Sequence, residues 1–364
     1  MRTVRGDNEE VKTLLLTVDP SGLNETDVLD RAAGILRAGG LVALPTETVY
    51  GLGANALDRA AVSRIFAAKQ RPAWDPVIVH IADAAMLAVL VSEIPDAARS
   101  RVDKLIEHFW PGPLTLLLPR SDEVPNAVTA GRPLVGVRMP AHPVALELIR
   151  RAEVPIAAPS ANLFGHISPT TAAHVLHDLG GRIDAVLDAG PTEHGVESTV
   201  LDPCQSPMVI YRPGAVTLEQ IRVVAGPVDV YRESAELSAT PMESLPSPGV
   251  GLRHYAPRAR LILVEGTAED MAYRLEQTSL EIKQERIGVM LPADLHAHGF
   301  LRNSHIYPWG AWAKPEEMAH ELYSGLRALD ALGCTVILCP LPPSEGIGAA
   351  LRDRLRKAAA MAEQ

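Results

Sequence analysis

Residues 41–48, Leu41-Val42-Ala43-Leu44-Pro45-Thr46-Glu47-Thr48, contain the pattern that decides the fold of this chain. Four apolar residues predict a short buried strand, and the proline ends it. A helix is expected before the strand, because apolar residues recur at helical spacing from Thr26 until Gly39-Gly40 stops the pattern. Two hydroxyls and a carboxylate follow the strand, where α/β proteins usually bind ligands. A turn with capping hydroxyls explains them equally well.

Similar patterns continue along the chain and predict a mixed α/β domain. Further strands are expected at 77–81, 114–118, 134–137, 155–158, 185–187, 199–201 and 209–211, with helices at 58–69, 83–91, 96–108, 142–151 and 170–179. Ser168-Pro169 has the form of a helix start, a capping hydroxyl followed by proline. The order of the strands cannot be predicted from these patterns.

A second and smaller domain is expected after a linker. Residues 232–257 are rich in proline, serine and glutamate and lack a clean periodicity, which is typical of a linker. Strands then alternate with helices, at 261–264, 268–283, 287–291, 315–332, 336–338 and 347–360. This alternation predicts a small parallel, Rossmann-like sheet covered by helices. We therefore divide the chain into an N-terminal domain (1–230), a linker (231–258) and a C-terminal domain (259–364).

Composition limits the function classes. The chain has 364 residues, 47% of them hydrophobic, and a net charge of −10, so an overall basic footprint for nucleic acid is absent. Three cysteines, Cys204, Cys334 and Cys339, do not suggest a disulfide framework. Residues 1–10 lack the apolar core of a signal peptide, and no apolar run is long enough for a membrane span. A cytoplasmic protein is therefore expected.

Cations and a histidine occupy the next strand ends. Lys69 and Arg71 end a helix, where cations are favourable whatever the function, but two cations beside a strand end could also hold a polyphosphate. His80, taken alone, is more often a hydrogen-bonded core residue than a catalyst. Arg138 follows an apolar strand directly, so it needs either a structural ion pair, slightly the better interpretation, or an anionic ligand.

Small polar residues complete the pattern. Ser160 and Asn162 follow a strand and suit hydrogen bonds to phosphate or ribose; Ser198 and Arg212 stand at two later strand ends. Gly51-Leu52-Gly53-Ala54-Asn55-Ala56 matches a loose dinucleotide fingerprint, but it does not follow its strand directly, so we interpret these glycines as those of a tight loop. Together the strand ends indicate an anion-positioning site for phosphoryl or nucleotidyl transfer, without a serine or cysteine triad.

These residues resemble the YrdC-like family of L-threonylcarbamoyladenylate synthases in its long, two-domain form. The resemblance covers about residues 26–226 and extends through the linker segments 247–249 and 254–257 into the C-terminal domain. The matching motifs are 45–53, 68–72, 110–115, 137–140, 158–162, 195–199 and 212–214. It implies an N-terminal YrdC-like twisted mixed sheet with flanking helices. Two positions depart from the family pattern: Asp75 stands where asparagine is common, and Leu134 where threonine or serine is common.

The resemblance also implies a reaction, in which L-threonine, bicarbonate and ATP give threonylcarbamoyl-AMP and pyrophosphate for the modification of tRNA beside the anticodon. The residues expected on the threonine side are Thr48, His80, Arg138 and Ser198. Those expected on the ATP side are Lys69, Arg71, Ser160, Asn162, Ser168 and Arg212, with His254 and Tyr255 as a lid from the linker. Lys69 and Arg71 are the expected catalytic residues.

The expected cofactor is Mg²⁺ brought with ATP, without a tightly bound organic cofactor. The expected partner is a tRNA threonylcarbamoyl transferase complex that takes the product, without a membrane or stable direct binding of nucleic acid. Two alternatives stay open at this point. One is an RNA-binding module of the same fold, against which the acidic balance argues. The other is a carbamoyl-transfer domain, which usually has extra domains.

Overall fold

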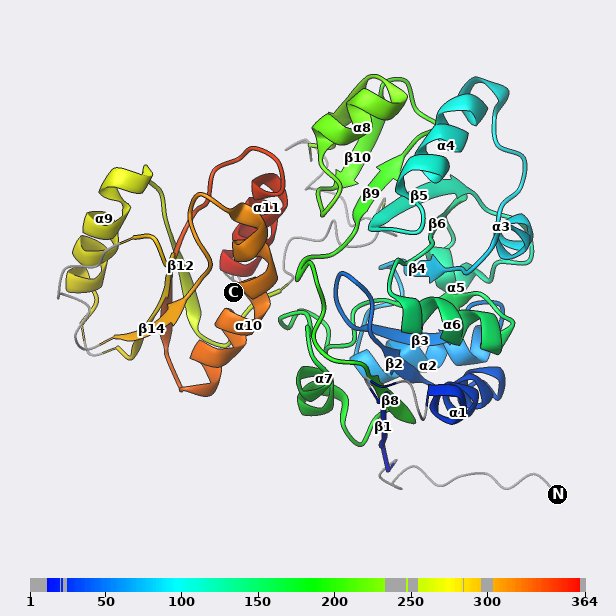
Figure 1. Cartoon of the computed structure of the whole chain (residues 1–364), viewed down its shortest axis with the longest axis horizontal. Helices are drawn as coiled ribbons and strands as arrows, with labels where there is room; N and C mark the ends of the chain where they lie inside the picture. The colour runs from blue at the N-terminus through cyan, green and yellow to red at the C-terminus, as the bar shows by residue number, and fades with distance from the viewer. Residues whose placement is uncertain are drawn as a thin grey trace.

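The computed structural model describes residues 12–19, 21, 25–232, 247, 255–283, 285–295 and 304–360, and these form two α/β domains. Figure 1 shows the larger N-terminal domain on the right and the smaller C-terminal domain on the left. Most of the predicted linker, 233–246 and 248–254, lies outside the described residues, and so does His254.

The N-terminal domain is built on an eleven-stranded mixed sheet in the order β1-β8-β2-β3-β7-β4-β6-β5-β9-β10-β11. Its strands are β1 (Leu14–Thr17), β2 (Val42–Leu44), β3 (Gly51–Asn55), β4 (Ile78–His80), β5 (Leu114–Pro119), β6 (Leu134–Arg138), β7 (Ile156–Ala157), β8 (Ala185–Asp188), β9 (Thr199–Asp202), β10 (Met208–Arg212) and β11 (Val228–Val230). The central strands β7, β4 and β6 come from distant parts of the chain; β4 and β6 are parallel and end side by side, while β7 runs antiparallel to β4.

Helices cover both faces of this sheet. They are α1 (Glu25–Arg37), α2 (Arg59–Lys69), α3 (Ala84–Leu90), α4 (Asp96–Phe109), α5 (Asn126–Thr129), α6 (Pro143–Ala152), α7 (Ala172–Leu179) and α8 (Leu218–Ala225). Strand β2 is uniformly apolar because both of its faces are buried. Leu41 and Ala43 enter one core, while Val42 and Leu44 enter the core that α1 and α6 cover.

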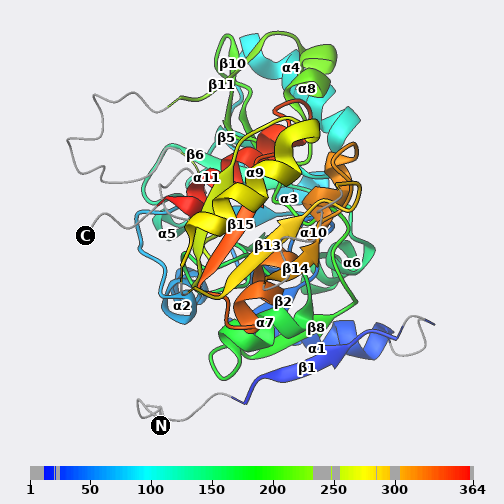
Figure 2. The same ribbon diagram turned by 90° about the vertical axis from the view of Figure 1, so that its left-hand side faces the viewer.

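The C-terminal domain confirms the predicted parallel sheet. It contains β12 (Arg260–Val264), α9 (Ala268–Glu281), β13 (Ile287–Leu291), β14 (His305–Pro308), α10 (Pro315–Ala331), β15 (Val336–Pro340) and α11 (Gly348–Ala359), with the strand order β12-β15-β13-β14. Helix α9 covers the outer face, and α10 and α11 lie on the inner face toward the N-terminal domain (Figures 1 and 2).

Two expectations about local structure are wrong. Residues 51–55 form strand β3, antiparallel to β2, and not a tight loop. Gly53 is required by close packing, because an added Cβ would lie 2.8 Å from Leu44 and 2.9 Å from Ile156. Ser168 does not start a helix: α7 begins at Ala172 with Thr171 as its N-cap, and the Ser168 hydroxyl binds Glu197 instead.

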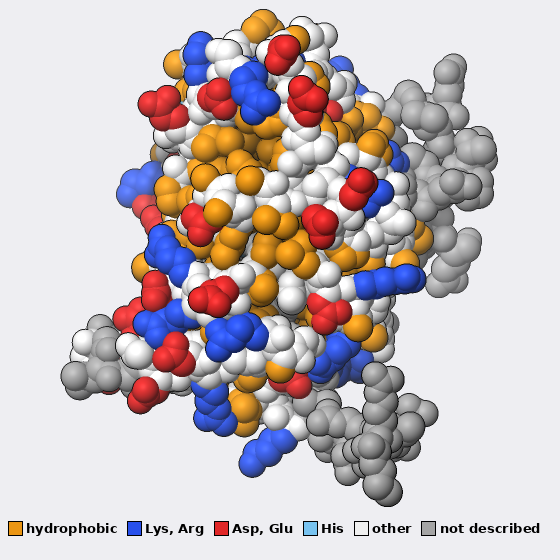
Figure 3. Space-filling view, turned by 90° about the vertical axis from the view of Figure 1, so that its right-hand side faces the viewer, with side chains coloured by type: hydrophobic (Ala, Val, Ile, Leu, Met, Phe, Trp, Pro, Cys, Tyr) orange, Lys and Arg blue, Asp and Glu red, His pale blue; other side chains and the backbone are white. Residues whose placement is uncertain are grey.

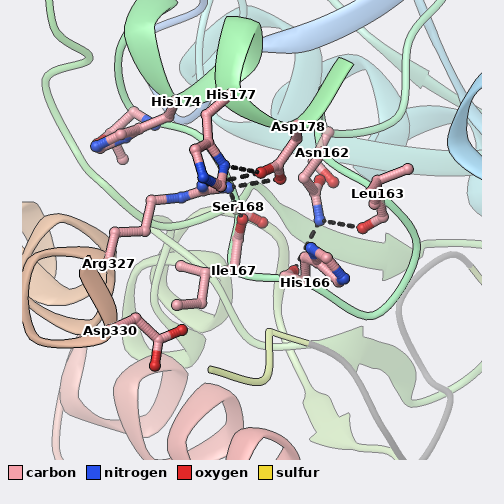
Figure 4. Close-up of polar contacts among 12 residues, drawn as sticks. Asn162, Leu163, His166, Ile167, Ser168, His174, His177, Asp178, Arg327 and Asp330 are labelled. Carbon is pink, nitrogen blue, oxygen red and sulfur yellow. Dashed lines mark hydrogen bonds and ion pairs between the residues drawn. The ribbon is translucent and has the colours of Figure 1, made fainter. Parts of the chain in front are cut away.

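The two domains share an apolar core and several polar contacts. Val49, Ile167 and Val196 of the N-terminal domain belong to the same buried cluster as the inner face of α10 and α11. Arg327 of α10 pairs with Asp178 of α7, with 2.9 Å between Nη2 and Oδ2, as Figure 4 shows. The inner helices are therefore buried by the N-terminal domain.

The face of the N-terminal domain that points away from the C-terminal domain carries interspersed acidic and basic side chains among apolar ones (Figure 3). Such mixed charge differs from the one-sign surface that binds nucleic acid backbones. Among the described residues, no helix has the length and apolar character that a membrane crossing requires.

Gly195 provides a test of the domain contact. It has a φ of +70°, and an added Cβ would lie 2.4 Å from the carbonyl oxygen of Ala319 in α10. Gly181 has a similar φ of +80° with nothing near it. We expect Gly195→Ala to lower stability by roughly 1–2 kcal/mol more than Gly181→Ala, because only the first adds a clash to the backbone strain. Differential scanning calorimetry of both variants measures this; equal losses would show that the contact with α10 does not matter.

Candidate active site

A cavity in the N-terminal domain gathers the polar ends of the central strands. Its wall is made of residues 46, 48, 49, 51, 71, 76–78, 80, 138, 158–160, 197, 198, 212 and 255. Eight of the twelve predicted site residues line it: Thr48, Arg71, His80, Arg138, Ser160, Ser198, Arg212 and Tyr255. Lys69, Asn162 and Ser168 lie behind the wall, and His254 is outside the described residues.

Arg138 forms both a structural ion pair and part of the cavity wall. Its Nη2 lies 2.7 Å from Oε1 of Glu47, its Nη1 donates to Thr48 Oγ1 at 2.9 Å, and its Nε donates to Gly112 O. Burial would raise the pKa of Glu47, but the Arg138 charge lowers it below its usual value, so the carboxylate is ionised. Each terminal nitrogen has two N–H groups, which leaves donors for an anionic ligand.

The loop after β2 is organised by one hydroxyl. Thr46 Oγ1 accepts the backbone N–H groups of Thr48 and Val49 and donates to Val49 O at 2.6 Å. It also lies 2.8 Å from Thr48 Oγ1. The capping interpretation of this loop is therefore correct for Thr46, and the turn that results presents Thr48 to the cavity.

His80 is the last residue of β4 and lies beside Arg138 in the parallel register of β4 and β6. Burial, together with the nearby Arg138 charge, lowers the pKa of His80 to about 3. The imidazole is therefore neutral at physiological pH. His80 lines the cavity, although its Nδ1 is a buried atom that does not reach the surface of the wall.

Arg71 follows the left-handed C-cap residue Gln70 of α2, which turns the chain back toward the cavity. Its Nη2 lies 2.9 Å from Oδ1 of Asp75 and donates to Pro76 O at 2.7 Å. Its guanidinium also lies 6.0 Å from the centre of the Phe164 ring. The departure at Asp75 therefore places a carboxylate beside this arginine, where its charge is balanced.

Arg212, at the end of β10, holds the segment before β9. Its Nε and Nη2 donate to Ser198 O, and Nη2 reaches Ser198 Oγ at 3.2 Å. Thr115 of β5 lies 2.8 Å from the same hydroxyl. Gly214 permits this approach, because an added Cβ would lie 2.4 Å from Glu197 O. Ser198 is thus fixed from two strands while it faces the cavity.

Lys69 and Asn162 support the segment after β7 from behind. The Lys69 ammonium donates to the carbonyls of Ser160 and Asn162, and burial lowers its pKa well below the usual value. The Asn162 amide donates to Leu163 O and His166 O (Figure 4). These two residues shape the segment that presents Ser160 rather than reaching into the cavity themselves.

Ser168 binds Glu197, which the predicted site did not include. Ser168 donates to Glu197 Oε1 at 2.6 Å, and Tyr323 and Arg354 of the C-terminal domain bind the same carboxylate. Burial would raise the pKa of Glu197, but the charges of Arg354 and Arg212 bring it to about 2. Burial raises the pKa of Tyr255 to about 12, so its phenol is neutral.

Three carboxylates that pair with arginines here were not identified from the sequence: Glu47, Asp75 and Glu197. The pairing of Asp75 could have been predicted, since its i,i+4 spacing from Arg71 suits an ion pair. The other two carboxylates meet their arginines only through the fold. Leu134, the second departure, packs on Ile78, Leu117 and Val200 and is not part of the cavity wall.

The carboxylates in and beside the cavity do not form a metal cage. Glu47, Asp75 and Glu197 each lie against an arginine. In the part of the chain that the structure describes, no group of three or more His, Cys, Asp or Glu side chains converges as a metal site requires. These residues therefore do not fit a protein-held Mg²⁺ ion.

Two family models match the chain. The model of the Sua5, YciO and YrdC proteins, described as telomere recombination, matches residues 34–214. The model of the threonylcarbamoyl-AMP synthase C-terminal domain matches residues 216–360. The two matches together cover every strand of both sheets except β1.

Curated relatives are similar over most of the chain. The threonylcarbamoyl-AMP synthase of Pyrococcus abyssi is 45% identical over 90% of this chain and 92% of its own length. The Bacillus subtilis threonylcarbamoyl-AMP synthase is 44% identical with the same coverage. A putative threonylcarbamoyl-AMP synthase of Mycobacterium tuberculosis is 40% identical, but it covers 54% of this chain and 88% of its own length.

The fold is similar as well. The crystal structure of P. abyssi Sua5 complexed with L-threonine superposes with a TM-score of 0.85 and 42% identity, covering 95% of this chain and 98% of that one. With this identity over both domains, the chain belongs to the threonylcarbamoyl-AMP synthase family, in the form that joins a YrdC-like domain to a Sua5 C-terminal domain.

Proposed function

We propose that this chain synthesises threonylcarbamoyl-AMP and pyrophosphate from L-threonine, bicarbonate and ATP, for the modification of tRNA next to the anticodon. The observation that carries the proposal is a cavity that combines buried arginines with hydroxyls and a neutral histidine, in a chain similar throughout to named threonylcarbamoyl-AMP synthases. A related structure of this fold holds L-threonine. The site thus suits an amino acid and a polyphosphate together.

The reaction needs no protein nucleophile. The threonine amine attacks the carbon of bicarbonate with loss of water, or of CO₂ with loss of a proton, to form a carbamate. A carbamate oxygen then attacks the α-phosphate of ATP, and pyrophosphate leaves. Catalysis then consists of aligning the carbamate with the α-phosphate and of neutralising the negative charge on the phosphates. An open site of hydroxyls and guanidinium groups, without a triad, is suited to this chemistry.

On the threonine side, Arg138 grips the carboxylate with the N–H groups that Glu47, Thr48 and Gly112 leave free. Thr48 and Ser198 offer hydroxyls to the substrate, and the neutral His80 lies in the wall beside them. Directed hydrogen bonds of this kind discriminate against analogues that lack the hydroxyl better than an apolar pocket does.

On the ATP side, Arg71, Arg212, Ser160 and Tyr255 receive the nucleotide. Lys69 and Asn162 assist by shaping the segment that carries Ser160. Mg²⁺ enters with the ATP phosphates, since the carboxylates of the cavity already face arginines. The enzyme works in the cytoplasm, and a tRNA threonylcarbamoyl transferase complex consumes its product.

The reaction itself is the first test. We expect the purified chain to release pyrophosphate from ATP at a rate that requires both L-threonine and bicarbonate, because the attacking group forms from these two. A coupled pyrophosphate assay with each substrate omitted in turn measures this. Release that ignores threonine would refute the proposed function.

Arg71 tests the role of charge on the ATP side. We expect Arg71→Ala to lower kcat by roughly 100-fold or more, because a preorganised cation facing the phosphates is lost. It also breaks a buried ion pair with Asp75, which we expect to cost roughly 3 kcal/mol of stability. Arg71→Ala/Asp75→Asn removes both charges and should regain stability but not turnover, as chemical unfolding and steady-state kinetics would measure. Recovery of turnover in the double variant would contradict the role.

His80 predicts a pH dependence of stability. Its folded pKa of about 3 lies below the ordinary value of 6.5, so between these pH values the unfolded chain binds a proton that the folded chain excludes. This contribution is full above pH 6.5 and is lost as pH falls, by about 2 kcal/mol from pH 7 to pH 5. His80→Asn should flatten the fall in the free energy of unfolding by that amount, measured with urea at several pH values.

The exposed His108 serves as the matched control, because water reaches it in folded and unfolded chains alike. His108→Asn should keep the slope of the unaltered chain. An unchanged slope in His80→Asn would show that His80 can take up a proton in the folded state.

A further inference from the structure

A buried polar cluster connects the C-terminal domain to the ATP side of the cavity. Glu197, 5% exposed, accepts hydrogen bonds from Ser168 Oγ at 2.6 Å, Tyr323 Oη at 2.9 Å and Arg354 Nε at 2.7 Å. Tyr323 belongs to α10 and Arg354 to α11, and both are buried. Two helices of the C-terminal domain therefore hold the carboxylate that in turn holds Ser168.

The same two side chains also hold Tyr255, which lines the cavity. The rings of Tyr255 and Tyr323 stack with centroids 5.8 Å apart and an interplanar angle of 24°. The Arg354 guanidinium, which also binds Glu197, lies 5.2 Å from the centre of the Tyr255 ring. Tyr255 has a φ of +67°, a left-handed conformation that is strained for a tyrosine and persists where neighbours impose it.

The threonine side has separate supports. Ser198 is held by Thr115 and Arg212, and Arg138 by Glu47, Thr48 and Gly112, all within the N-terminal domain. Removing the polar groups of Tyr323 or Arg354 would thus act directly on Glu197 and Tyr255, while these hydrogen bonds of the threonine side stay in place.

Attachment of the domains does not depend on this cluster alone. Arg327 binds Asp178 and donates to Ile167 O on the other side of the segment that carries Ser168 (Figure 4). Gly195 packs directly on α10, and His320 of α10 lies 2.8 Å from Glu193 O. In addition to these contacts between the domains, Tyr323 and Arg354 contact Glu197 and Tyr255 directly.

We infer that Tyr323 and Arg354 are positioning residues for ATP: the C-terminal domain completes the nucleotide side of the site by fixing Ser168, through Glu197, and Tyr255. This inference rests on the proposed function for the identity of the nucleotide. It assigns the C-terminal domain a role in the affinity for ATP and none in the affinity for L-threonine.

Tyr323→Phe tests this with the smallest change, because it removes the hydroxyl bonds to Glu197 and keeps the ring. The matched control is Tyr307→Phe, which removes a tyrosine hydroxyl bond to Glu321 elsewhere in the same domain. We expect Tyr323→Phe to weaken ATP binding roughly 3- to 10-fold, as the loss of one buried hydrogen bond to a charged group implies. The Kd for L-threonine should stay within about twofold of the original, and Tyr307→Phe should change neither.

Isothermal titration calorimetry with ATP and with L-threonine separately gives both Kd values, and the KM for each substrate in the pyrophosphate assay provides the second readout. Tyr323→Leu, which also removes the ring stacked on Tyr255, should weaken ATP binding further. A Tyr323→Phe protein with the same ATP Kd as Tyr307→Phe would overturn the inference. Equal weakening for ATP and threonine with a lower Tm would also overturn it, because that is the result of a merely structural role.

The experiment also separates this inference from the proposed function. Calorimetry measures ATP binding without turnover, so an unaltered chain that binds ATP but forms no pyrophosphate with threonine and bicarbonate would refute the proposed function alone. The selective effect of Tyr323→Phe on ATP affinity would still support the positioning role in that case.

Discussion

The arrangement of the site depends on the pairing of three buried guanidinium groups with carboxylates. Arg138 lies against Glu47, Arg71 against Asp75, and Arg354 against Glu197, each pair nearly sealed from water. Burying such a cation alone would cost far more than the fold can supply. Each carboxylate also fixes the plane of its arginine, so the donors that remain point in set directions. The cavity can therefore meet two anionic substrates with groups that need little reorganisation.

The sheet places these pairs. Arg138 and His80 end neighbouring parallel strands, and Arg212 ends a strand antiparallel to the one that follows Ser198. Several supports lie behind the wall: Thr46 shapes the loop of Thr48, and Lys69 holds the carbonyls around Ser160. Substrate-facing side chains are thus carried by a rigid layer of backbone bonds.

Much of the C-terminal domain could be predicted, because most of its strands and helices are marked by local periodic patterns. Parallel strands joined by helices also allow few arrangements. The order of the larger sheet could not, since β3, β7, β4 and β6 pair across up to about a hundred residues. Strand β3 was missed because its glycines serve contacts with Leu44 and Ile156 that the sequence does not reveal. The polar strand ends were found from position alone. Only the fold shows that Glu47 and Glu197 are partners of arginines. Only the fold shows, too, that Ser168 donates a hydrogen bond to Glu197 and does not cap a helix.

Glu197 has an implication for how such a chain can change its length. A gene shortened to its first domain would lose Arg354 and Tyr323 and leave a carboxylate facing water where an interface had been. The shorter Mycobacterium tuberculosis relative corresponds to about half of this chain. Separated from its second domain, the first domain of this chain would therefore keep a carboxylate beside the cavity while losing two of its hydrogen-bond donors, Tyr323 and Arg354.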